Sequence, residues 1–366
     1  MQDWQGRTRA NILRIPPYVP GKPIEEVQRE LGLADVIKLA SNENPLGPSP
    51  MALRAMQDAA ARVSYYPDAR AFHLREALAK RYGMDAAGVI VGNGSDEIIR
   101  LAAEAFLGPG DEAVICEPTF GEYLYAVHLL GAEPVTVRAD GGQDLEAISA
   151  AITARTKLVF VCNPNNPTGT AFGGDAFAAF LAGLPPGVLV VYDAAYREYA
   201  DAGSLPDGPG LVRAGAPLLF LGTFSKLYGL AGLRVGYGLG APGLIDLLHR
   251  VKEPFNVNLV AQAAAAAALD DAEHVQKSLA LNAAGKKQLY EGLAALGLDY
   301  LPTQTNFILV DLGREAEGVY RALLARGVIV RPAGVFGLPR RIRVTIGTAA
   351  QNERFLAALA EALGGR

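Results

Sequence analysis

Lys226 is the residue of this sequence best placed to act as an amine nucleophile. It lies in the segment TFSKLYGLAGLR (223–234), where apolar side chains flank it and glycines loosen the backbone. A lysine in partly buried, glycine-rich surroundings binds its proton less tightly, and the neutral amine can then attack a carbonyl group. Most lysines are instead solvated surface cations, so this chemistry needs support from neighbouring residues.

Phosphate-binding residue types occur in the same segment and in one other. Thr223 lies just before the lysine and Arg234 lies eight residues after it, and a hydroxyl with a guanidinium suits a phosphate. The stretch GNGSDE (92–97) predicts a loop that opens a helix, where free N–H groups and the positive end of the helix dipole attract an anion. A dinucleotide fingerprint needs a small residue where Glu97 stands, which disfavours a nicotinamide site. A tight turn with a helix cap explains this stretch equally well.

A carboxylate and an amide-rich loop follow two other apolar runs. Asp193 follows GVLVVY and precedes Tyr196, and a carboxylate at the end of a buried strand is costly unless a cation or donor meets it. The loop NPNNPTG (163–169) follows KLVFVC, and its constrained asparagines can hydrogen-bond a planar ligand. Asp193 could instead cap the next helix, and the loop could be turn chemistry alone.

The elements that position these residues are predicted to form an α/β sheet. Apolar, strand-like runs lie at 88–94, 112–118, 133–138, 157–162, 187–193, 217–224 and 232–239. Amphipathic, helix-like segments lie between them at 95–107, 121–130, 144–154 and 174–183. Most of the runs are continuously apolar, so we expect a mostly parallel sheet with helices on both faces. Ligands of such sheets bind at the carboxyl ends of the strands, where the polar residues above are found.

The regular alternation of strand-like and helix-like segments ends after Ala241. A helix-rich stretch runs to about Leu296, and strand-like and helical segments then alternate to the end, which predicts a smaller α+β domain. We expect residues 1–47 to form an N-terminal arm and part of the small domain, 48–245 the large ligand-binding domain, and 246–366 the small C-terminal domain with its linking helices. The Pro-rich segment before Pro48 is expected to be irregular and to pack on another element or subunit.

Composition excludes several classes of protein. The chain has 366 residues, of which 50% are hydrophobic and 20% charged, and its net charge of -4 gives no basic surplus for nucleic acid. No apolar run reaches the ~20 residues of a membrane-spanning helix and no signal peptide is expected, so we expect a cytoplasmic protein. Cys116 and Cys162 lie in apolar runs as core residues, and the histidines lack ligand spacing, so no metal site is expected.

Taken together, the polar residues describe one kind of cofactor site. An amine, a carboxylate, a tyrosine and a phosphate cradle on neighbouring strand ends match pyridoxal 5'-phosphate, which a lysine binds as a Schiff base while a charged residue faces its pyridine nitrogen. Each motif alone is weak evidence, whereas the four in this order are strong.

The sequence resembles the class I and II aminotransferases of fold type I over nearly its whole length, and within them the histidinol-phosphate aminotransferases. The matching stretches are LASNENPLGPSP, YYPD, GNGSDEII, PTFGEY, NPNNPTG, YDAAYREY, TFSKLYGLAGLRVGY, TNFILV and IVRPAGVFGLPRRIRVTIGT. The resemblance implies a mostly parallel central sheet with helices on both faces, a smaller α+β domain, and a homodimer with shared active sites.

The resemblance also implies roles for individual residues. Lys226 would hold the cofactor and move the substrate proton, and Asp193 would keep the pyridine nitrogen protonated. Tyr196 and Asn166 would hold the ring oxygen, and Phe120 would stack on the ring, where many relatives have tyrosine or tryptophan. The residues expected near the cofactor phosphate are Ser95, Asp96, Glu97, Thr223, Ser225 and Arg234, with Tyr66 of the partner subunit. The residues expected at the substrate are Tyr18, Asn44, Asn306, Arg331 and Arg343. The bond between Asn166 and Pro167 is expected to be cis.

The implied reaction transfers the amino group of L-glutamate to imidazole acetol phosphate, which gives L-histidinol phosphate and 2-oxoglutarate in L-histidine biosynthesis. Arg343 alternates with Ile342 and Val344, and its guanidinium fork suits either a carboxylate or a phosphate, whereas Arg340 and Arg341 could be solvated. Two alternatives on the same scaffold are an aromatic amino acid aminotransferase and a threonine-phosphate decarboxylase. A non-enzymatic regulator is a third, against which the intact lysine argues.

Overall fold

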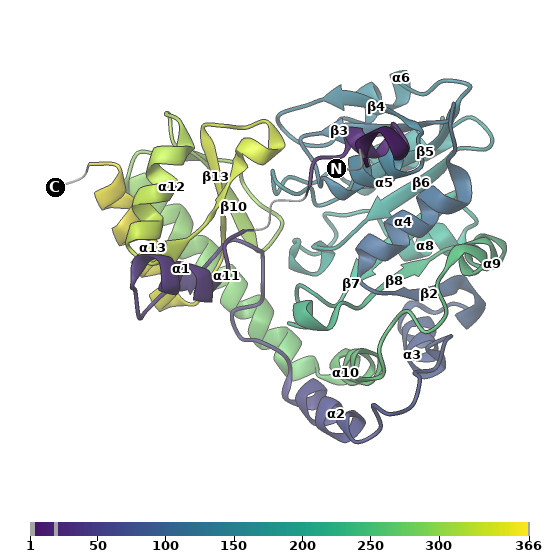
Figure 1. Cartoon of the computed structure of the whole chain (residues 1–366), viewed down its shortest axis with the longest axis horizontal. Coiled ribbons are helices and arrows are strands. Elements are labelled where there is room, and N and C mark those ends of the chain that lie inside the picture. Colours follow the sequence, from purple (N-terminus) through teal and green to yellow (C-terminus); the bar gives the residue numbers. More distant parts are fainter. Residues whose placement is uncertain (1–3, 18–20, 365–366) are drawn as a thin grey trace.

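The computed structural model describes residues 4–17 and 21–364, and its largest unit is a seven-stranded sheet (Figure 1). The strands are β2 (Val89–Gly92), β3 (Glu112–Glu117), β4 (Glu133–Arg138), β5 (Thr156–Cys162), β6 (Leu189–Asp193), β7 (Leu218–Thr223) and β8 (Gly236–Leu239). Their order across the sheet is β2-β8-β7-β6-β5-β3-β4, and β8 alone runs in the direction opposite to the other six strands. Each of the seven predicted strands is found, and the mostly parallel sheet is confirmed.

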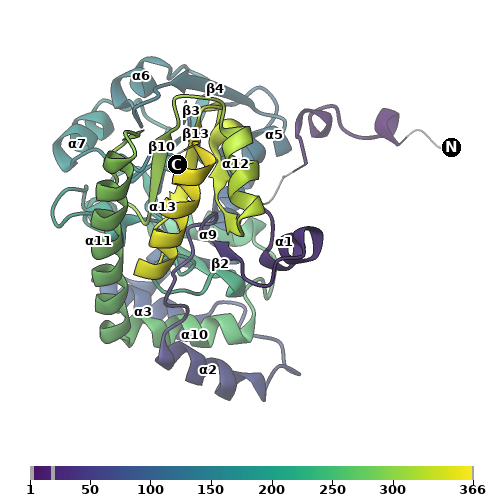
Figure 2. The ribbon, with the colours of Figure 1, turned by 90° about the vertical axis from the view of Figure 1, so that its left-hand side faces the viewer.

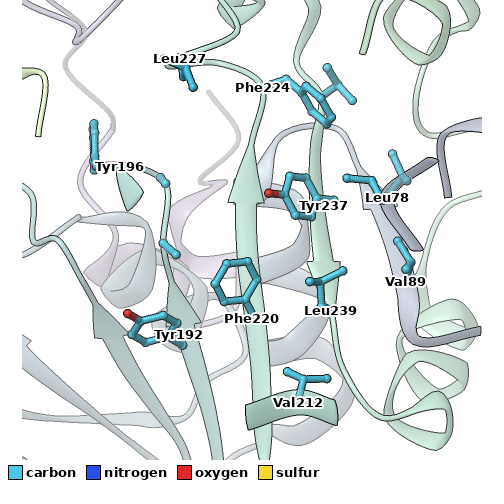
Figure 3. Close-up of a cluster of buried hydrophobic side chains, with 14 of the residues drawn as sticks. Leu78, Val89, Tyr192, Tyr196, Val212, Phe220, Phe224, Leu227, Tyr237 and Leu239 are labelled. Carbon is cyan, nitrogen blue, oxygen red and sulfur yellow. The ribbon is translucent and has the colours of Figure 1, made fainter. Parts of the chain in front are cut away.

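Both faces of this sheet are covered, because successive residues of its strands point into two different cores. On β7, Leu218 and Phe220 enter one buried cluster, and Leu219 and Leu221 enter the other. Figure 3 shows part of the first cluster, in which Phe220 lies between Tyr192 and Tyr237 of the adjacent strands. This double burial explains why the strands are continuously apolar in sequence.

Helices supply the other half of each core. On one face lie α4 (Ser95–Phe106), α5 (Glu122–Leu129) and α9 (Pro242–Val251). On the other lie α3 (Phe72–Tyr82), α6 (Leu145–Ala150), α7 (Gly174–Ala182), α8 (Gly208–Arg213) and α10 (Leu259–Asp270), and α10 also packs on α2 (Pro50–Ala60). The four helices predicted between the strands are found as α4 to α7. Among the described helices, none is both long and apolar enough to cross a membrane.

A smaller antiparallel sheet forms the C-terminal part. Its order is β12-β13-β10-β9, made of β9 (Asp299–Tyr300), β10 (Phe307–Asp311), β12 (Arg331–Pro332) and β13 (Arg341–Thr345). It packs with α11 (Ala272–Ala295), α12 (Ala316–Ala325) and α13 (Ala349–Ala362), which Figure 2 shows side by side in front of β10 and β13. The predicted α+β character of this region is confirmed.

The prediction that the segment before Pro48 is irregular is wrong for part of it. Residues 24–31 form α1 (Ile24–Leu31), and β1 (Ile37–Lys38) pairs in parallel with β11 (Val328–Ile329). The prolines of this segment lie on either side of residues 24–44, which leaves an amphipathic stretch free to form a helix. The segment does pack on other elements, as expected, and residues 39–44 (the crossing segment) run on to the site described below.

Short 3-10 helices complete the structure at Gln5–Arg7, Ile12–Arg14, Ala86–Gly88, Arg197–Tyr199, Ala231–Leu233 and Ala333–Phe336. Cys116 and Cys162 are buried and unpaired, in agreement with the prediction that they are core residues.

Candidate active site

Three neighbouring strands bring the predicted acid, amide loop and lysine to one edge of the large sheet. Asp193 is the last residue of β6 and lies opposite Cys162, the last residue of β5, after which the asparagine-rich loop begins. Thr223 ends β7 on the other side of β6, and Lys226 follows three residues later. Parallel strands end at a common edge, so three sequence motifs meet at one place.

Asp193 is held as a buried carboxylate with a donor on each oxygen. The residue is 3% exposed; Oδ2 accepts a hydrogen bond from the hydroxyl of Tyr123 at 2.8 Å, and Oδ1 accepts one from the backbone N–H of Ala195 at 3.1 Å. Burial raises the pKa of Asp193 to about 6, while the two hydrogen bonds act in the opposite direction. The carboxylate is therefore mostly ionised at neutral pH and is suited to face a cation.

Lys226 has the environment expected of a reactive amine. Its Nζ donates to the carbonyl oxygen of Ser41 at 3.2 Å and lies 5.6 Å from the centre of the Tyr196 ring. Burial, followed by the positive charge of Arg343, lowers the pKa of Lys226 to about 8. A useful fraction of this amine is therefore neutral near pH 7, in contrast to a solvated lysine.

Tyr196 is fixed by a residue that the sequence analysis did not single out. The Tyr196 hydroxyl accepts a hydrogen bond from Nδ2 of Asn42 at 2.9 Å, and its ring meets Phe307 edge-on at 5.1 Å. Asn42 is buried and has a φ of 58°, a left-handed conformation that asparagine tolerates better than most residues. The only signal in the sequence is an asparagine pair inside SNEN, which gives no hint of its distant partner.

The hydroxyl, guanidinium and helix-terminal groups predicted to bind a phosphate lie together. Helix α4 begins at Ser95 after Gly94, and no side chain caps its first N–H groups. Arg234 reaches this end of the helix, with Nη2 at 2.8 Å from Asp96 and Nη1 at 3.5 Å from Oγ of Ser225. Gly94 has a φ of 84°, and a Cβ there would lie only 2.6 Å from Arg234 Nη2, so the approach of Arg234 requires glycine.

Thr223 and Glu97 contribute to this region in different ways. The Thr223 hydroxyl accepts from the backbone N–H of Ser225 at 3.1 Å, which orders the turn that leads to Lys226. The carboxylate of Glu97 accepts hydrogen bonds from the backbone of Asn93 and from Nδ2 of Asn256, the latter at 2.6 Å. Because the carboxyl group of Glu97 is buried and engaged with the loop, we assign it to support of that loop and not to contact with a phosphate.

The predicted substrate residues approach from the small sheet. Arg343 and Arg331 are directly paired across β13 and β12, so their side chains share one face. Arg343 is buried; Nη2 donates to the carbonyl oxygen of Ala40 at 2.7 Å, Nη1 donates to Oδ1 of Asn166, and its guanidinium lies 5.2 Å from the ring of Phe307. Arg340, by contrast, is exposed.

Two asparagines predicted at the substrate brace the crossing segment. Asn306 donates through Nδ2 to the carbonyl oxygen of Asn42 at 3.0 Å. Asn44 donates through Nδ2 to the carbonyl oxygen of Leu227 at 2.7 Å and to Oγ of Ser278 at 2.9 Å. Both side chains thus connect the crossing segment to the residues around Lys226 and Arg343.

Other predicted residues lie at the margin of this constellation or outside it. Phe120 is half-buried and meets Tyr123 edge-on at 5.7 Å. Tyr66 is 82% exposed and stacks on Phe255 at 4.7 Å, so one chain alone does not bring it to the site. Tyr18 lies outside the described residues.

The predicted cis bond between Asn166 and Pro167 is present, and the bonds before Pro118 and Pro164 are also cis. All three lie in loops that follow strands β3 and β5.

The donor groups at this edge fit pyridoxal phosphate. The uncapped start of α4, the hydroxyls of Thr223 and Ser225 and the guanidinium of Arg234 suit the phosphate. The buried carboxylate of Asp193 suits a protonated ring nitrogen, and the partly neutral amine of Lys226 suits an aldehyde.

Comparison with known proteins agrees with this chemistry. The family model described as aminotransferase class I and II matches residues 34–359. The histidinol-phosphate aminotransferase of Moorella thermoacetica is 55% identical over 98% of this chain and 93% of its own length. The histidinol-phosphate aminotransferase 2 of Pseudomonas aeruginosa is 50% identical over 99% of both chains.

A solved structure shows the same fold. The crystal structure of histidinol-phosphate aminotransferase from Sinorhizobium meliloti in complex with pyridoxal-5'-phosphate superposes with a TM-score of 0.91, at 31% identity and over 98% of both chains. The fold is therefore the fold-type I arrangement that the sequence resemblance implied, and the chain belongs to the class I and II aminotransferase family.

Proposed function

We propose that this protein is a pyridoxal-phosphate-dependent histidinol-phosphate aminotransferase. It transfers the amino group of L-glutamate to imidazole acetol phosphate, giving L-histidinol phosphate and 2-oxoglutarate, and so serves L-histidine biosynthesis. The observation that carries the proposal is the buried Arg343, which lies beside Asn166 and close enough to Lys226 to lower the pKa of its amine. The names of the relatives that match the chain nearly end to end support the same substrate.

Binding of the cofactor rests on groups at both ends of the site. When bound, pyridoxal phosphate supplies an aldehyde that accepts the amino group and a ring that takes up the electron pair of the substrate Cα. The start of α4, with Ser95, Thr223, Ser225 and Arg234, anchors the phosphate. Asp193 holds a negative charge at the other end, kept in place by Tyr123 and Ala195.

Lys226 and Tyr196 serve the reacting centre. The Nζ atom of Lys226 accepts and returns the proton of the substrate Cα, because a pKa of about 8 lets both of its protonation states exist near neutral pH. Tyr196 presents a hydroxyl that Asn42 holds in one orientation. Asn166 lies in the loop after β5, and its Oδ1 accepts a hydrogen bond from Arg343, which supports its proposed role beside Tyr196 at the oxygen of the cofactor ring.

The arginine pair on the small sheet recognises the anionic end of each substrate. Arg343, assisted by Arg331, binds the α-carboxylate of glutamate in one half of the reaction and the phosphate of histidinol phosphate in the other. A guanidinium fork suits both anions, so one site serves two substrates in turn. Asn44 and Asn306 brace the wall of the pocket. Tyr18, outside the described residues, keeps the role at the substrate that the resemblance implies.

We also propose a homodimer in which Tyr66 of one subunit reaches the cofactor phosphate of the other. In support, the link between α2 and α3 carries strongly exposed aromatic side chains, Tyr65 and Tyr66, and Phe72 and Phe255 are exposed nearby. Tyr65 and Tyr66 line a hollow of about 360 Å³ with residues of α10. Exposed apolar patches of this kind mark association surfaces. Sedimentation equilibrium tests the dimer, and a monomeric species that retains full activity contradicts it.

The division of the chain into domains is part of the proposal. We assign residues 48–245 to the cofactor-binding domain and residues 246–366, with residues 1–47, to the small domain and its links. The strands of the large sheet lie within the first range, those of the small sheet lie within the second, and β1 pairs with β11. We also place the enzyme in the cytoplasm, with small molecules as substrates and with neither nucleic acid nor membrane as partner.

Steady-state kinetics test the proposed substrate. With 2-oxoglutarate as acceptor, kcat/KM for L-histidinol phosphate is expected to exceed that for phenylalanine by at least ~10²-fold, because a phosphate carries more charge and more acceptor oxygens for Arg343 and Arg331 than the α-carboxylate of phenylalanine does. Equal values for the two donors overturn the proposal in favour of an aromatic aminotransferase. Release of carbon dioxide from threonine phosphate overturns it in favour of a decarboxylase.

A further inference from the structure

Tyr123 is held by aromatic packing in a way that fixes its hydroxyl. The side chain comes from α5 and is fully buried. Its ring stacks on Phe160 of β5, with ring centres 5.1 Å apart and planes 11° from parallel, and meets Phe120 edge-on at 5.7 Å. A ring fixed from two directions leaves its hydroxyl little freedom, and a buried tyrosine hydroxyl needs a partner.

That partner is the carboxylate of Asp193. The Tyr123 hydroxyl donates to Oδ2 at 2.8 Å, while the backbone N–H of Ala195 occupies Oδ1. Hydrogen bonds to a carboxylate stabilise its ionised form, and two donors on different oxygens also set the orientation of the carboxylate plane. Tyr123 is not among the residues that the sequence predicts for the site, although a tyrosine on an apolar helix face is a signal for a buried hydrogen bond.

We propose that Tyr123 is a positioning residue of the aminotransferase site, whose hydroxyl aims the Asp193 carboxylate at the cofactor ring nitrogen and keeps it ionised. This inference rests on the proposed pyridoxal phosphate cofactor. Tyr123 acts through Asp193 and needs no contact with cofactor or substrate.

The other groups that act on Asp193 come from several elements. The negative charge of Asp96 on α4 raises the pKa of Asp193, and the positive charge of Lys226 lowers it. The thiol of Cys162 on β5 is neutral in the working range, since burial raises its pKa to about 12. Burial also raises the pKa values of Tyr123, Tyr192 and Tyr196, so these hydroxyls stay protonated. Removing the Tyr123 hydroxyl leaves Asp96, Lys226, Cys162, Tyr192 and Tyr196 in place, although Cys162 loses its own hydrogen bond with Tyr123.

The affinity for pyridoxal phosphate is linked to the ionisation of Asp193, and this linkage sets the direction in which the affinity changes with pH. Pyridoxal phosphate binds best when Asp193 is ionised, so its affinity falls as the pH drops through the pKa of Asp193, about 6. Loss of the Tyr123 hydrogen bond raises that pKa, which moves the fall in affinity to higher pH. One charge-assisted hydrogen bond corresponds to a shift of about one pH unit, and hence to about fivefold weaker binding at pH 6.

The test is the dissociation constant of pyridoxal phosphate, measured by equilibrium dialysis between pH 5 and 8 for the parent protein, Tyr123→Phe and Tyr192→Phe. Tyr192 is a matched control, because it is as deeply buried and immediately precedes Asp193, but its hydroxyl accepts from Asn163 Nδ2 at 3.1 Å on the opposite face of the sheet. The midpoint is expected to rise by about one unit in Tyr123→Phe only. An unchanged midpoint in a folded Tyr123→Phe protein overturns the inference.

A second substitution keeps the test decisive if Tyr123→Phe fails to fold. Tyr123→3-fluorotyrosine keeps the ring and makes the hydroxyl a stronger donor, so the midpoint is expected to fall below that of the parent. A midpoint that stays in place or rises overturns the inference. If the parent protein binds no pyridoxal phosphate at any pH, the proposed function itself fails, which is a distinct result.

Discussion

The cofactor side and the substrate side of the site are built in different ways. Within one chain, most of the groups assigned to the cofactor lie at or soon after the ends of β2, β5, β6 and β7, in motifs of twelve residues or fewer. The described groups assigned to the substrate are Asn44, Asn306, Arg331 and Arg343, which meet only when the small sheet and the N-terminal segment pack beside the large sheet. One sheet thus orders the cofactor side, while several separate contacts order the substrate side.

The crossing segment (39–44) joins the two sides. The carbonyl oxygen of Ala40 accepts from Arg343 on the substrate side, and the carbonyl oxygen of Ser41 accepts from Lys226 on the cofactor side. The next residue of the segment, Asn42, donates a hydrogen bond to the hydroxyl of Tyr196. Substitutions on the cofactor side should therefore abolish most of kcat, whereas substitutions in the crossing segment should lower kcat/KM only moderately.

The largest effect is expected at the centre of the cofactor side. Lys226→Ala should lower kcat for histidinol phosphate by at least ~10³-fold, because it removes both the amine that holds the cofactor and the base for the substrate proton. Steady-state assays check this, with Lys277→Ala on the exposed face of α11 as the control. A variant that retains a tenth of parental kcat contradicts the assignment.

The next effect is expected on the substrate side. Arg343→Gln should lower kcat/KM for histidinol phosphate and for glutamate by about 10²-fold each, while cofactor affinity changes little, because about 3 kcal/mol of charge-assisted binding is lost. Arg340→Gln, at an exposed position of the same strand region, is the control and should be near parental. If Arg343→Gln loses cofactor affinity by the same factor as kcat/KM, the cofactor side and the substrate side do not act independently.

The pH dependence of covalent cofactor binding tests the pKa of Lys226, on the cofactor side. Only the neutral amine attacks an aldehyde, and the pKa of Lys226 is about 8, so the rate of covalent capture by the cofactor-free protein should rise about tenfold between pH 7 and 9 and then level off. Stopped-flow absorbance measures this rate. A rate that keeps rising to pH 10 shows that Lys226 behaves as an ordinary solvated lysine.

The smallest effect is expected in the crossing segment. Asn42→Gly removes the hydrogen bond to Tyr196 while keeping the left-handed backbone easy to adopt, and should lower kcat/KM about fivefold, the equivalent of about 1 kcal/mol. Asn42→Ala adds backbone strain, so it should lose stability as well, measured by thermal unfolding. Parental kcat/KM in Asn42→Gly means that the Tyr196 orientation does not depend on Asn42.

The sequence predicted more of the cofactor side than of the substrate side, for a physical reason. Thr223, Lys226 and Arg234 lie within twelve residues, and Asp193 ends an apolar strand, so local patterns reveal both their types and their place at a sheet edge. Glu97 lies in such a motif too, but only the structure shows that its carboxylate is occupied by Asn93 and Asn256.

By itself, the sequence determined the seven strands, their burial on both faces and the polar groups that follow them, because hydrophobic periodicity and turn chemistry act over a few residues. Tertiary structure alone decided that Tyr123 would meet Asp193 and that Asn42 would meet Tyr196. These partners are 70 and 154 residues apart in the chain, and a hydrogen bond at such a separation depends on how whole helices and segments pack, which no local pattern records.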